Sequence, residues 1–300
     1  MAIKTVRARV NGTWHTLTYN SGTGAYEATV TAPGATSYNQ PGGYYNVEVE
    51  ATNTAGTTTT ASASTLDGLK LVVKEKVAPI ITILSPTSGA YVTNSKQPVV
   101  FNVVDETGGS GVAVASVAVK LDGAAVATST LTHTAITGGY SFTFTPAAAM
   151  SDGSHTVQIT ASDNDGNAAA AKSTTFKVDT VPPTLNVTAP AEGLATNNAN
   201  LTVQGTTNDA TSSPVTVTIR LNGTDQGAVT VNANGSFSKA VTLTEGNNTI
   251  VITATDAAGK ASSITRNVIL DTSVPVIKSA RITPNPVDAG ATMVISVVIE

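Results

Sequence analysis

Apolar and polar residues alternate along most of the chain in short stretches, and this period of two predicts β-strands throughout. Clear examples are residues 47–51 (VEVEA), 157–161 (VQITA) and 217–221 (VTIRL). Several stretches end in the pairs Asn11-Gly12, Asp122-Gly123 or Asn222-Gly223. These pairs predict tight hairpin turns, because both central positions of such a turn need positive φ. No segment has a sustained helical period, so the pattern predicts an all-β protein.

The strand pattern is repeated three times. Residues 47–56, 157–166 and 250–259 each consist of an alternating strand that runs into an Asn/Asp…Gly turn. An aromatic strand also recurs in step, with Tyr26, Phe142 or Phe237 expected in the core between two sheets. The repeat is roughly 90 to 110 residues long, which is the size of one β-sandwich domain. We therefore expect tandem sandwich domains.

Prolines mark the joins between repeats, at residues 77–79, 181–183 and 274–275. Proline fixes φ and pushes the preceding residue to extended geometry, so each join is expected to be short and semi-rigid. The predicted domains are residues 1–76, 77–180, 181–273 and 274–300. Semi-rigid joins between them predict an elongated rod.

The first and last predicted domains are incomplete. The first repeat lacks the two strands that follow the join in the other repeats, and two such strands stand alone after the last join. A missing central strand uncovers core side chains at a cost on the order of 10 kcal/mol. A whole domain is stable by only about 5–15 kcal/mol. Residues 1–76 are therefore not expected to fold stably alone.

These two incomplete parts predict strand complementation, in which the C-terminal strands complete an N-terminal half-domain. The partner is another copy of the chain, or the same copy folded back on itself. The alternatives are a piece cut from a longer chain, or a first domain that uses other strands. The residues expected to carry the contact are Ile277, Ile282, Met293, Ile295, Val297 and Ile299 on one side, and Val6 and Val10 on the other.

The composition limits the kinds of partner that the chain is expected to bind. Charged residues make up 12% of the chain, the net charge is −4 and no basic cluster is present, which argues against nucleic acid. No stretch has the length of a membrane-spanning helix, so membrane insertion is not expected. The segment 1–6 has no apolar signal-peptide region, so we expect the chain to stay in the cytoplasm or to leave by another route.

No catalytic motif is recognisable, so we expect neither an enzyme nor a cofactor. The three histidines lack zinc-site spacing. Asp163, Asp165 and Asn167 form a weak calcium candidate, because their oxygen ligands alternate along the loop. The alternative for this loop is a polar hairpin turn. Asp105, Glu106 and Asp179 are further carboxylates expected near domain ends.

Aromatic residues are concentrated in the first repeat. Trp14, Tyr38, Tyr44 and Tyr45 are candidate surface-binding residues, because exposed rings stack against sugars or anchor protein interfaces. The alternative is that these rings fill the incomplete domain or cap its open edge.

The pattern Val-x-Ile-Thr-Ala-x-Asp-x-x-Gly, with the join Val-Asp-Thr-x-x-Pro at residues 178–183, resembles the immunoglobulin-like repeats of bacterial surface adhesins and of phage tail proteins. The resemblance implies immunoglobulin-like sandwich domains and a non-catalytic structural module of a phage or phage-like particle. The implied partners are a second copy, another virion protein and host-surface carbohydrate, and the implied location is the virion or the extracellular space after release. The alternative is a spacer or adhesion segment of a bacterial cell-surface protein.

Overall fold

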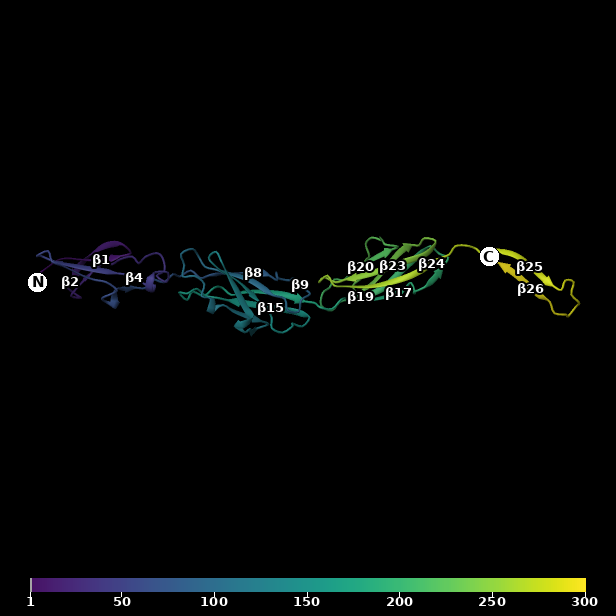
Figure 1. Cartoon of the computed structure of the whole chain (residues 1–300), viewed down its shortest axis with the longest axis horizontal. Helices are drawn as coiled ribbons and strands as arrows, with labels where there is room; N and C mark the ends of the chain where they lie inside the picture. Colours follow the sequence, from purple (N-terminus) through teal and green to yellow (C-terminus); the bar gives the residue numbers. More distant parts are fainter. Residues whose placement is uncertain (1) are drawn as a thin grey trace. The chain divides into compact units, whose positions relative to one another are not determined.

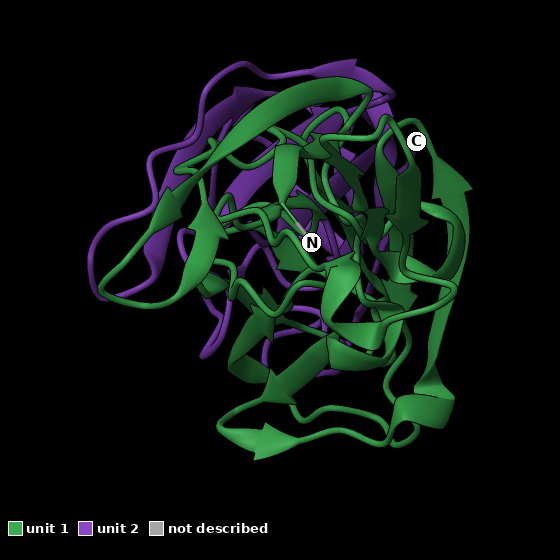
Figure 2. Ribbon diagram, turned by 90° about the vertical axis from the view of Figure 1, so that its left-hand side faces the viewer, with its two compact units in different colours: residues 1–179 green, residues 180–300 purple. Residues whose placement is uncertain are grey.

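A computed structural model describes residues 2–300, in which strands form almost all of the regular structure (Figure 1). Contacts divide the chain into two compact units, residues 1–179 and 180–300 (Figure 2). No helix among the described residues is long and apolar enough to span a membrane. The predicted all-β class is confirmed.

The first part of unit 1 contains one five-stranded sheet, in the order β3-β2-β1-β5-β6, and a two-stranded sheet of β4 and β7. Positive φ at Asn11 (46°) and Gly12 (82°) confirms the predicted turn between β1 and β2. The elements are β1 (Ile3–Val10), β2 (Thr13–Asn20), β3 (Ala25–Glu27), η1 (Pro41–Gly43), β4 (Tyr45–Asn46), β5 (Glu48–Asn53), β6 (Thr58–Ala61), η2 (Asp67–Leu69) and β7 (Lys70–Leu71).

The second part of unit 1 is a β-sandwich of two sheets, β13-β14-β10-β8 and β12-β11-β15-β16-β9. Its core is dense: Phe101 and Phe142 are fully buried and stack with ring centroids 5.3 Å apart. The elements are β8 (Ile80–Ser85), β9 (Tyr91–Val92), β10 (Val99–Val104), η3 (Val114–Ser116), β11 (Ala118–Leu121), β12 (Ala124–Ala125), η4 (Thr128–Thr130), β13 (Leu131–Ile136), β14 (Gly139–Phe144), β15 (Gly153–Thr160) and β16 (Lys172–Val178).

Unit 2 contains a second sandwich, with sheets β17-β19-β22 and β18-β24-β23-β20-β21. Val203, Ile219, Ile250 and Ile252 are completely buried at its centre. The elements are β17 (Thr184–Ala189), β18 (Leu194–Thr196), β19 (Asn200–Asn208), β20 (Thr216–Leu221), β21 (Thr224–Asp225), β22 (Ser236–Thr242), β23 (Gly246–Thr255) and β24 (Ala261–Leu270).

The last two strands, β25 (Ile277–Thr283) and β26 (Val294–Ile299), pair only with each other. Their register places Ile282 opposite Ile295 and Ala280 opposite Val297, so these residues share one face of the hairpin. That face is exposed: Ile295 is 63% and Val297 47% accessible. The hairpin thus presents an apolar face that nothing among the described residues covers.

The sheet of residues 3–61 has the strand arrangement of one sheet of the sandwiches, and the other sheet in this part of the chain is only the two-stranded β4–β7. Val6, Ala8, Val49 and Ala51 point to one side, as their cross-strand pairing shows, and we call this side the open face. Only Val6 is buried, at 8% accessibility. The equivalent residues of the second repeat, Val117, Val119, Ile159 and Ala161, are all at most 5% accessible.

Tyr26 differs from the expectation that it lies in a core between two sheets. Phe142 and Phe237, its counterparts, are buried on strands that pair with β10 and β19. Residues 2–76 offer no such partner strand, so β3 pairs with β2 instead and forms the edge of that sheet. Tyr26 is therefore only half-buried, with its ring 5.3 Å from that of Tyr19.

Candidate metal centre and binding surfaces

The first repeat is held to the second sandwich by a small polar junction within unit 1. The backbone N–H of Glu75 donates to Asp165 Oδ2 at 3.0 Å, and Asn167 Nδ2 donates to the Glu75 carbonyl at 3.3 Å. On the other side, Asn39 Nδ2 donates to the carbonyl of Gly109 at 2.7 Å. The first two bonds fix the segment that carries Glu75 against the turn between β15 and β16, and the third ties Asn39 to the loop that follows β10.

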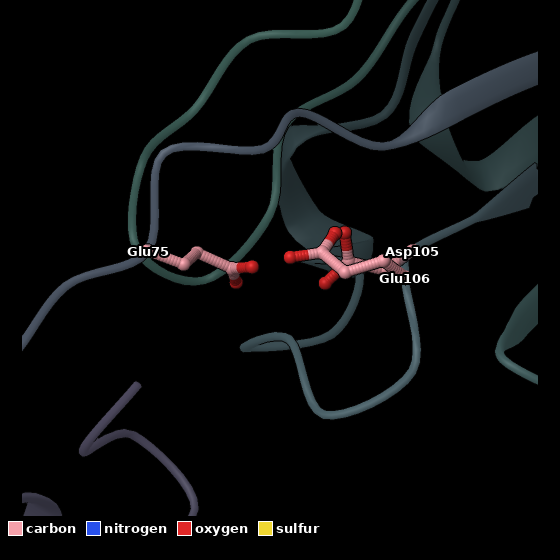
Figure 3. A group of neighbouring side chains, drawn as sticks. All are labelled: Glu75, Asp105 and Glu106. Atoms are coloured by element: carbon pink, nitrogen blue, oxygen red, sulfur yellow. The ribbon is translucent and has the colours of Figure 1, made fainter. Parts of the chain in front are cut away.

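Three carboxylates meet at this junction. Ligand oxygens of Glu75, Asp105 and Glu106 lie within 4.8 Å of one another, and the side chains point toward each other (Figure 3). Asp105 and Glu106 follow directly after β10, whereas Glu75 comes from the segment after β7. The group is built from parts of the chain about thirty positions apart, brought together by the fold.

The carboxylates are only partly satisfied. Asp105 is 6% accessible, and its Oδ2 accepts the backbone N–H of Gly111 at 2.7 Å. Glu75 Oε1 accepts the N–H of Ser110. Asp105 Oδ1 and Glu75 Oε2 are buried and have no hydrogen-bond partner among the described residues. Buried acceptors without a partner are rare in folded proteins, so this pair calls for a ligand or a proton.

The loop leaves room for close approach of these groups. A Cβ atom on Gly109 would lie 2.6 Å from Asp105 Oδ2 and 2.8 Å from Glu75 Oε2. A side chain at this position would require the neighbouring carboxylates to move apart.

Electrostatics at the cluster favour a positive charge. When it is protonated, Glu106 can donate a hydrogen bond to the Glu75 carboxylate, and this bond, together with burial and the nearby Asp105 charge, raises the pKa of Glu106 to about 7. Like charges held this close cannot all ionise without cost, so a proton is retained to near neutral pH. A bound cation would supply the same compensation without the proton.

The predicted calcium candidate has a different environment. Asp163 Oδ1 accepts the N–H groups of Gly166 at 2.7 Å and Asn167 at 2.8 Å, and its Oδ2 accepts Asn167 Nδ2 at 2.7 Å. Asp165 Oδ2 accepts from Thr36 Oγ1 and from the Glu75 backbone. The three residues predicted as ligands thus form hydrogen bonds within the turn and across the junction, and none of them belongs to the carboxylate cluster.

Sequence reasoning named Asp105 and Glu106 but missed Glu75. The available signal was an acidic residue just before a proline join in a chain with only 12% charged residues. Asp179, the other carboxylate expected near a domain end, is completely buried at the end of unit 1.

The predicted complementation residues lie on two separate surfaces. Ile277, Ile282, Met293, Ile295, Val297 and Ile299 belong to the C-terminal hairpin or its loop, and each is at least 43% accessible. Val6 and Val10 lie on the open face of the first repeat. The first set belongs to unit 2 and the second set to unit 1.

The predicted surface aromatics are also divided. Tyr45 is 8% accessible and donates its hydroxyl to the carbonyl of Ala35 at 3.2 Å, so it packs inside the first repeat. The ring of Tyr44 lies under the Lys70 ammonium group at 5.4 Å, and Tyr38 is 50% exposed. Trp14 lies on the opposite side of the sheet from the open face, at a separate cleft.

A buried histidine distinguishes the second repeat from the third. His155 Nδ1 lies 2.7 Å from Asp122 Oδ2, and Nε2 lies 2.8 Å from the Ser151 carbonyl. Burial acts to lower the pKa of His155, but these two bonds outweigh it and raise the pKa above the ordinary value. In the third repeat the same positions hold Asn248 and Asn222, and Asn222 Nδ2 donates to Asn248 Oδ1 at 3.1 Å.

Comparison with known proteins agrees with the sheet architecture. Residues 86–180 match the family model described as a bacterial Ig-like domain. The sandwich in the second part of unit 1 is therefore similar to bacterial Ig-like domains. Residues 183–272 match the model for domain B of glucodextranase.

One curated relative and several solved structures are similar to parts of the chain. Bacillopeptidase F of Bacillus subtilis is 31% identical over 129 residues, which span 43% of this chain and 8% of that protein. The fibronectin(III)-like modules of Clostridium thermocellum CbhA are 19% identical, with a TM-score of 0.40 over 64% of this chain and 94% of theirs. A 1.5-MDa bacterial ice-binding adhesin is 20% identical, with a TM-score of 0.32 over 90% of this chain and 88% of that chain.

Proposed function

We propose that this chain is a non-catalytic structural and adhesion module in which a divalent cation stiffens the junction inside unit 1. The observation that supports this most directly is Asp105 Oδ1, which is buried without a hydrogen-bond partner and points toward two further carboxylates (Figure 3). Leaving a buried acceptor unsatisfied costs about 1–3 kcal/mol, and more for a charged group. A cation at this point would remove that cost.

Calcium fits this cluster better than magnesium. Calcium accepts six to eight oxygen ligands in flexible geometry, whereas magnesium demands near-ideal octahedral geometry and gives up its waters reluctantly. The carboxylates of Glu75, Asp105 and Glu106 offer oxygens from two segments of the chain. An ion held by all three would tie residues 2–76 to the following sandwich, which is the mechanical role expected of a tandem-domain module.

Calorimetric titration of the full chain with calcium tests this role. The wild type should bind with measurable heat, and Asp105→Asn should lose the heat that belongs to the cluster. Asp288→Asn is the matched control, because it removes a carboxylate from an exposed loop in unit 2. Calcium bound elsewhere contributes equally to all three proteins and cancels in the difference. Identical titrations of wild type and Asp105→Asn would rule out the cation.

The finer form of the proposal places the module in a tail or capsid appendage of a phage or phage-like particle. Copies would join when the apolar face of the β25–β26 hairpin covers the open face of another copy. Support comes from the complementary exposure of the two surfaces: Ile295 is 63% accessible, and of the four open-face residues only Val6 is buried. Unpaired strand edges and apolar sheet faces are common sites of intermolecular strand addition.

Light scattering after size-exclusion chromatography tests the joining of copies. The wild type should form larger species as concentration rises, and Ile295→Asp should remain a monomer. Val294→Asp is the matched control, because Val294 is 62% accessible and lies on the opposite face of the same strand. A wild type that stays monomeric at high concentration contradicts complementation between copies.

A spacer or adhesion segment of a bacterial cell-surface protein is the second candidate. The match of residues 86–180 to a bacterial Ig-like domain favours it. A spacer needs stiff joins but no contact between copies. Calcium binding combined with a monomeric wild type would therefore favour the spacer over the particle component.

A further inference from the structure

We propose that a cleft on the outer side of the first repeat binds a neutral sugar chain, with Trp14 as its stacking platform. The inference rests on the adhesion role proposed above and names the ligand class for it. The cleft has a volume of about 290 Å³. Its walls carry one aromatic ring, two carboxylates and three hydroxyls, from Trp14, Glu48, Glu50, Thr60, Ser62 and Thr65.

Strand alternation builds the cleft on the side opposite the open face. The register pairs Arg9 with Trp14 on one neighbouring strand and with Glu48 on the other. In the adjacent row, Glu50 lies between Arg7 and Thr60. The outer side of four neighbouring strands is therefore a continuous polar surface around one indole ring.

The indole ring is held in place by its neighbours. The Arg7 guanidinium lies 4.4 Å from the ring centroid, and the same side chain donates to Glu50 Oε1 at 2.8 Å. A cation–π contact of this kind is attractive even at an exposed site. Trp14 remains 38% accessible, so part of its surface is free to stack on a ligand.

The carboxylates keep acceptor capacity for a ligand. The arginines use Oε1 of Glu50 and Oε2 of Glu48, the latter at 3.3 Å from Arg9, so each carboxylate retains a second oxygen. An ionised carboxylate has several acceptor sites and suits the adjacent hydroxyls of a pyranose ring. A few placed polar groups beside an apolar ring are the usual way in which a site orients a small ligand.

The balance of charges around the cleft favours a neutral ligand. Two arginines and two glutamates surround the ring, so the local charges cancel, and an anionic or cationic polymer gains nothing from the site as a whole. The apolar face of a hexopyranose can lie on the indole while its hydroxyls reach the rim. Neutral hexose chains therefore fit the cleft best.

The fold alone does not require these residues. In the second repeat, the strand positions equivalent to Trp14, Glu48 and Glu50 hold Ala125, Gln158 and Thr160. That repeat has a complete sandwich with the same hairpin and the same central pairing. The ring and the carboxylates are thus an addition to the scaffold, which argues against a purely structural role.

Intrinsic fluorescence tests the inference directly, because Trp14 is the only tryptophan in the chain. The full chain is titrated with maltohexaose, cellohexaose, laminarihexaose and mannohexaose at concentrations well above a Kd on the order of 1 mM. At least one should change the Trp14 emission in a saturable way. Absence of a saturable change with all four overturns the proposal.

Variants separate the cleft from the rest of the surface. Glu50→Gln and Thr60→Val should each weaken binding about tenfold, and Thr60→Val leaves the Arg7–Glu50 ion pair in place. Tyr19→Ala should bind as the wild type does, because Tyr19 lies on the same strand, is 55% exposed and does not line the cleft. Wild-type affinity in both cleft variants would overturn the proposal.

The outcome is independent of the cation and of assembly. The cleft variants should keep the wild-type calcium titration and the wild-type light scattering. A chain that binds calcium and forms larger species but ignores every sugar would retain the structural role and refute the sugar site alone.

Discussion

Replacing Asp105 by Asn should stabilise the protein without calcium and weaken it, relative to wild type, with calcium. The side chain is 6% accessible, and its carboxylate lies within 4.8 Å of two others. The Asn side chain keeps the shape and an oxygen for the Gly111 N–H. The substitution therefore removes a charge and changes little else.

The magnitude follows from the spacing of the charges. Two unit charges about 5 Å apart repel by about 3 kcal/mol at an effective dielectric constant near 20. Because Glu75 is partly accessible and solvent screens the pair, we expect a net gain of about 1 kcal/mol for Asp105→Asn in chelator. With calcium at a hundred times its Kd, the wild type gains about 2.7 kcal/mol from binding, which the variant lacks. The order of stability should therefore reverse.

Thermal unfolding with and without chelator measures this reversal. One kcal/mol corresponds to a Tm shift of about 2–4 °C in a unit of this size. In chelator, wild-type stability should also fall as pH rises from 4.5 to about 7, because the pKa of Glu106 is raised over that interval and its ionisation adds a third charge. A variant that is destabilised equally in both conditions would refute the electrostatic reasoning, because it would show that the carboxylate acts only through hydrogen bonds.

Three further predictions test other parts of the structure. Replacing His155 and Asp122 by Asn, as in the third repeat, should remove a pH dependence of stability, which thermal melting at a series of pH values measures. The raised pKa of His155 adds stability that is fully present below pH 6.5 and is lost as the pH rises through the raised pKa. The lowered pKa of Asp122 adds stability that is present above pH 3.8 and is lost as the pH falls through the lowered pKa. Phe101→Ala should cost about 3–5 kcal/mol in urea unfolding, because the ring is fully buried. Gly205→Ala should markedly lower the Tm, because its Cβ would lie 2.3 Å from a backbone oxygen, whereas Gly68→Ala has nothing within 4 Å and should not.

The strands and turns could be predicted because their causes are local. Alternation over five or six residues identifies a strand, and an Asp-Gly or Asn-Gly pair at the end of such a strand specifies a tight turn. The three pairs predicted to close hairpins at the ends of alternating strands have positive φ at both residues, as at Asp122 (50°) and Gly123 (82°). Neither feature depends on what the rest of the chain does.

The position of Tyr26 was not predictable from its own repeat. The same motif places Phe142 and Phe237 in a core, since β10 and β19 supply partner strands. Whether such a partner exists is decided by a segment outside the motif. A repeat therefore predicts a residue's role only as far as the neighbouring strands are also repeated.

The carboxylate cluster was hidden for a related reason. Asp105 and Glu106 are adjacent in sequence, but Glu75 joins them only through the hydrogen bonds that dock its segment against the turn at Asp165 and Asn167. The spacing of the oxygens in that turn made it a weak calcium candidate, with a polar hairpin turn as the alternative. Spacing alone cannot tell whether a carboxylate will bond to nearby N–H groups, as Asp163 does, or be left with a free oxygen, as Asp105 is.

The repeats keep one scaffold and vary what it carries. The pair that closes the end of a central strand is His155 with Asp122 in one repeat and Asn248 with Asn222 in the next, at the same positions. Shared positions therefore report what the sandwich needs, whereas positions that differ are free to serve another purpose. Function is therefore best sought at positions where one repeat has an exposed aromatic or charged residue and another repeat has a small or neutral one. The exposed Trp14, flanked by arginine–glutamate pairs, meets that condition more clearly than any turn that the repeats share.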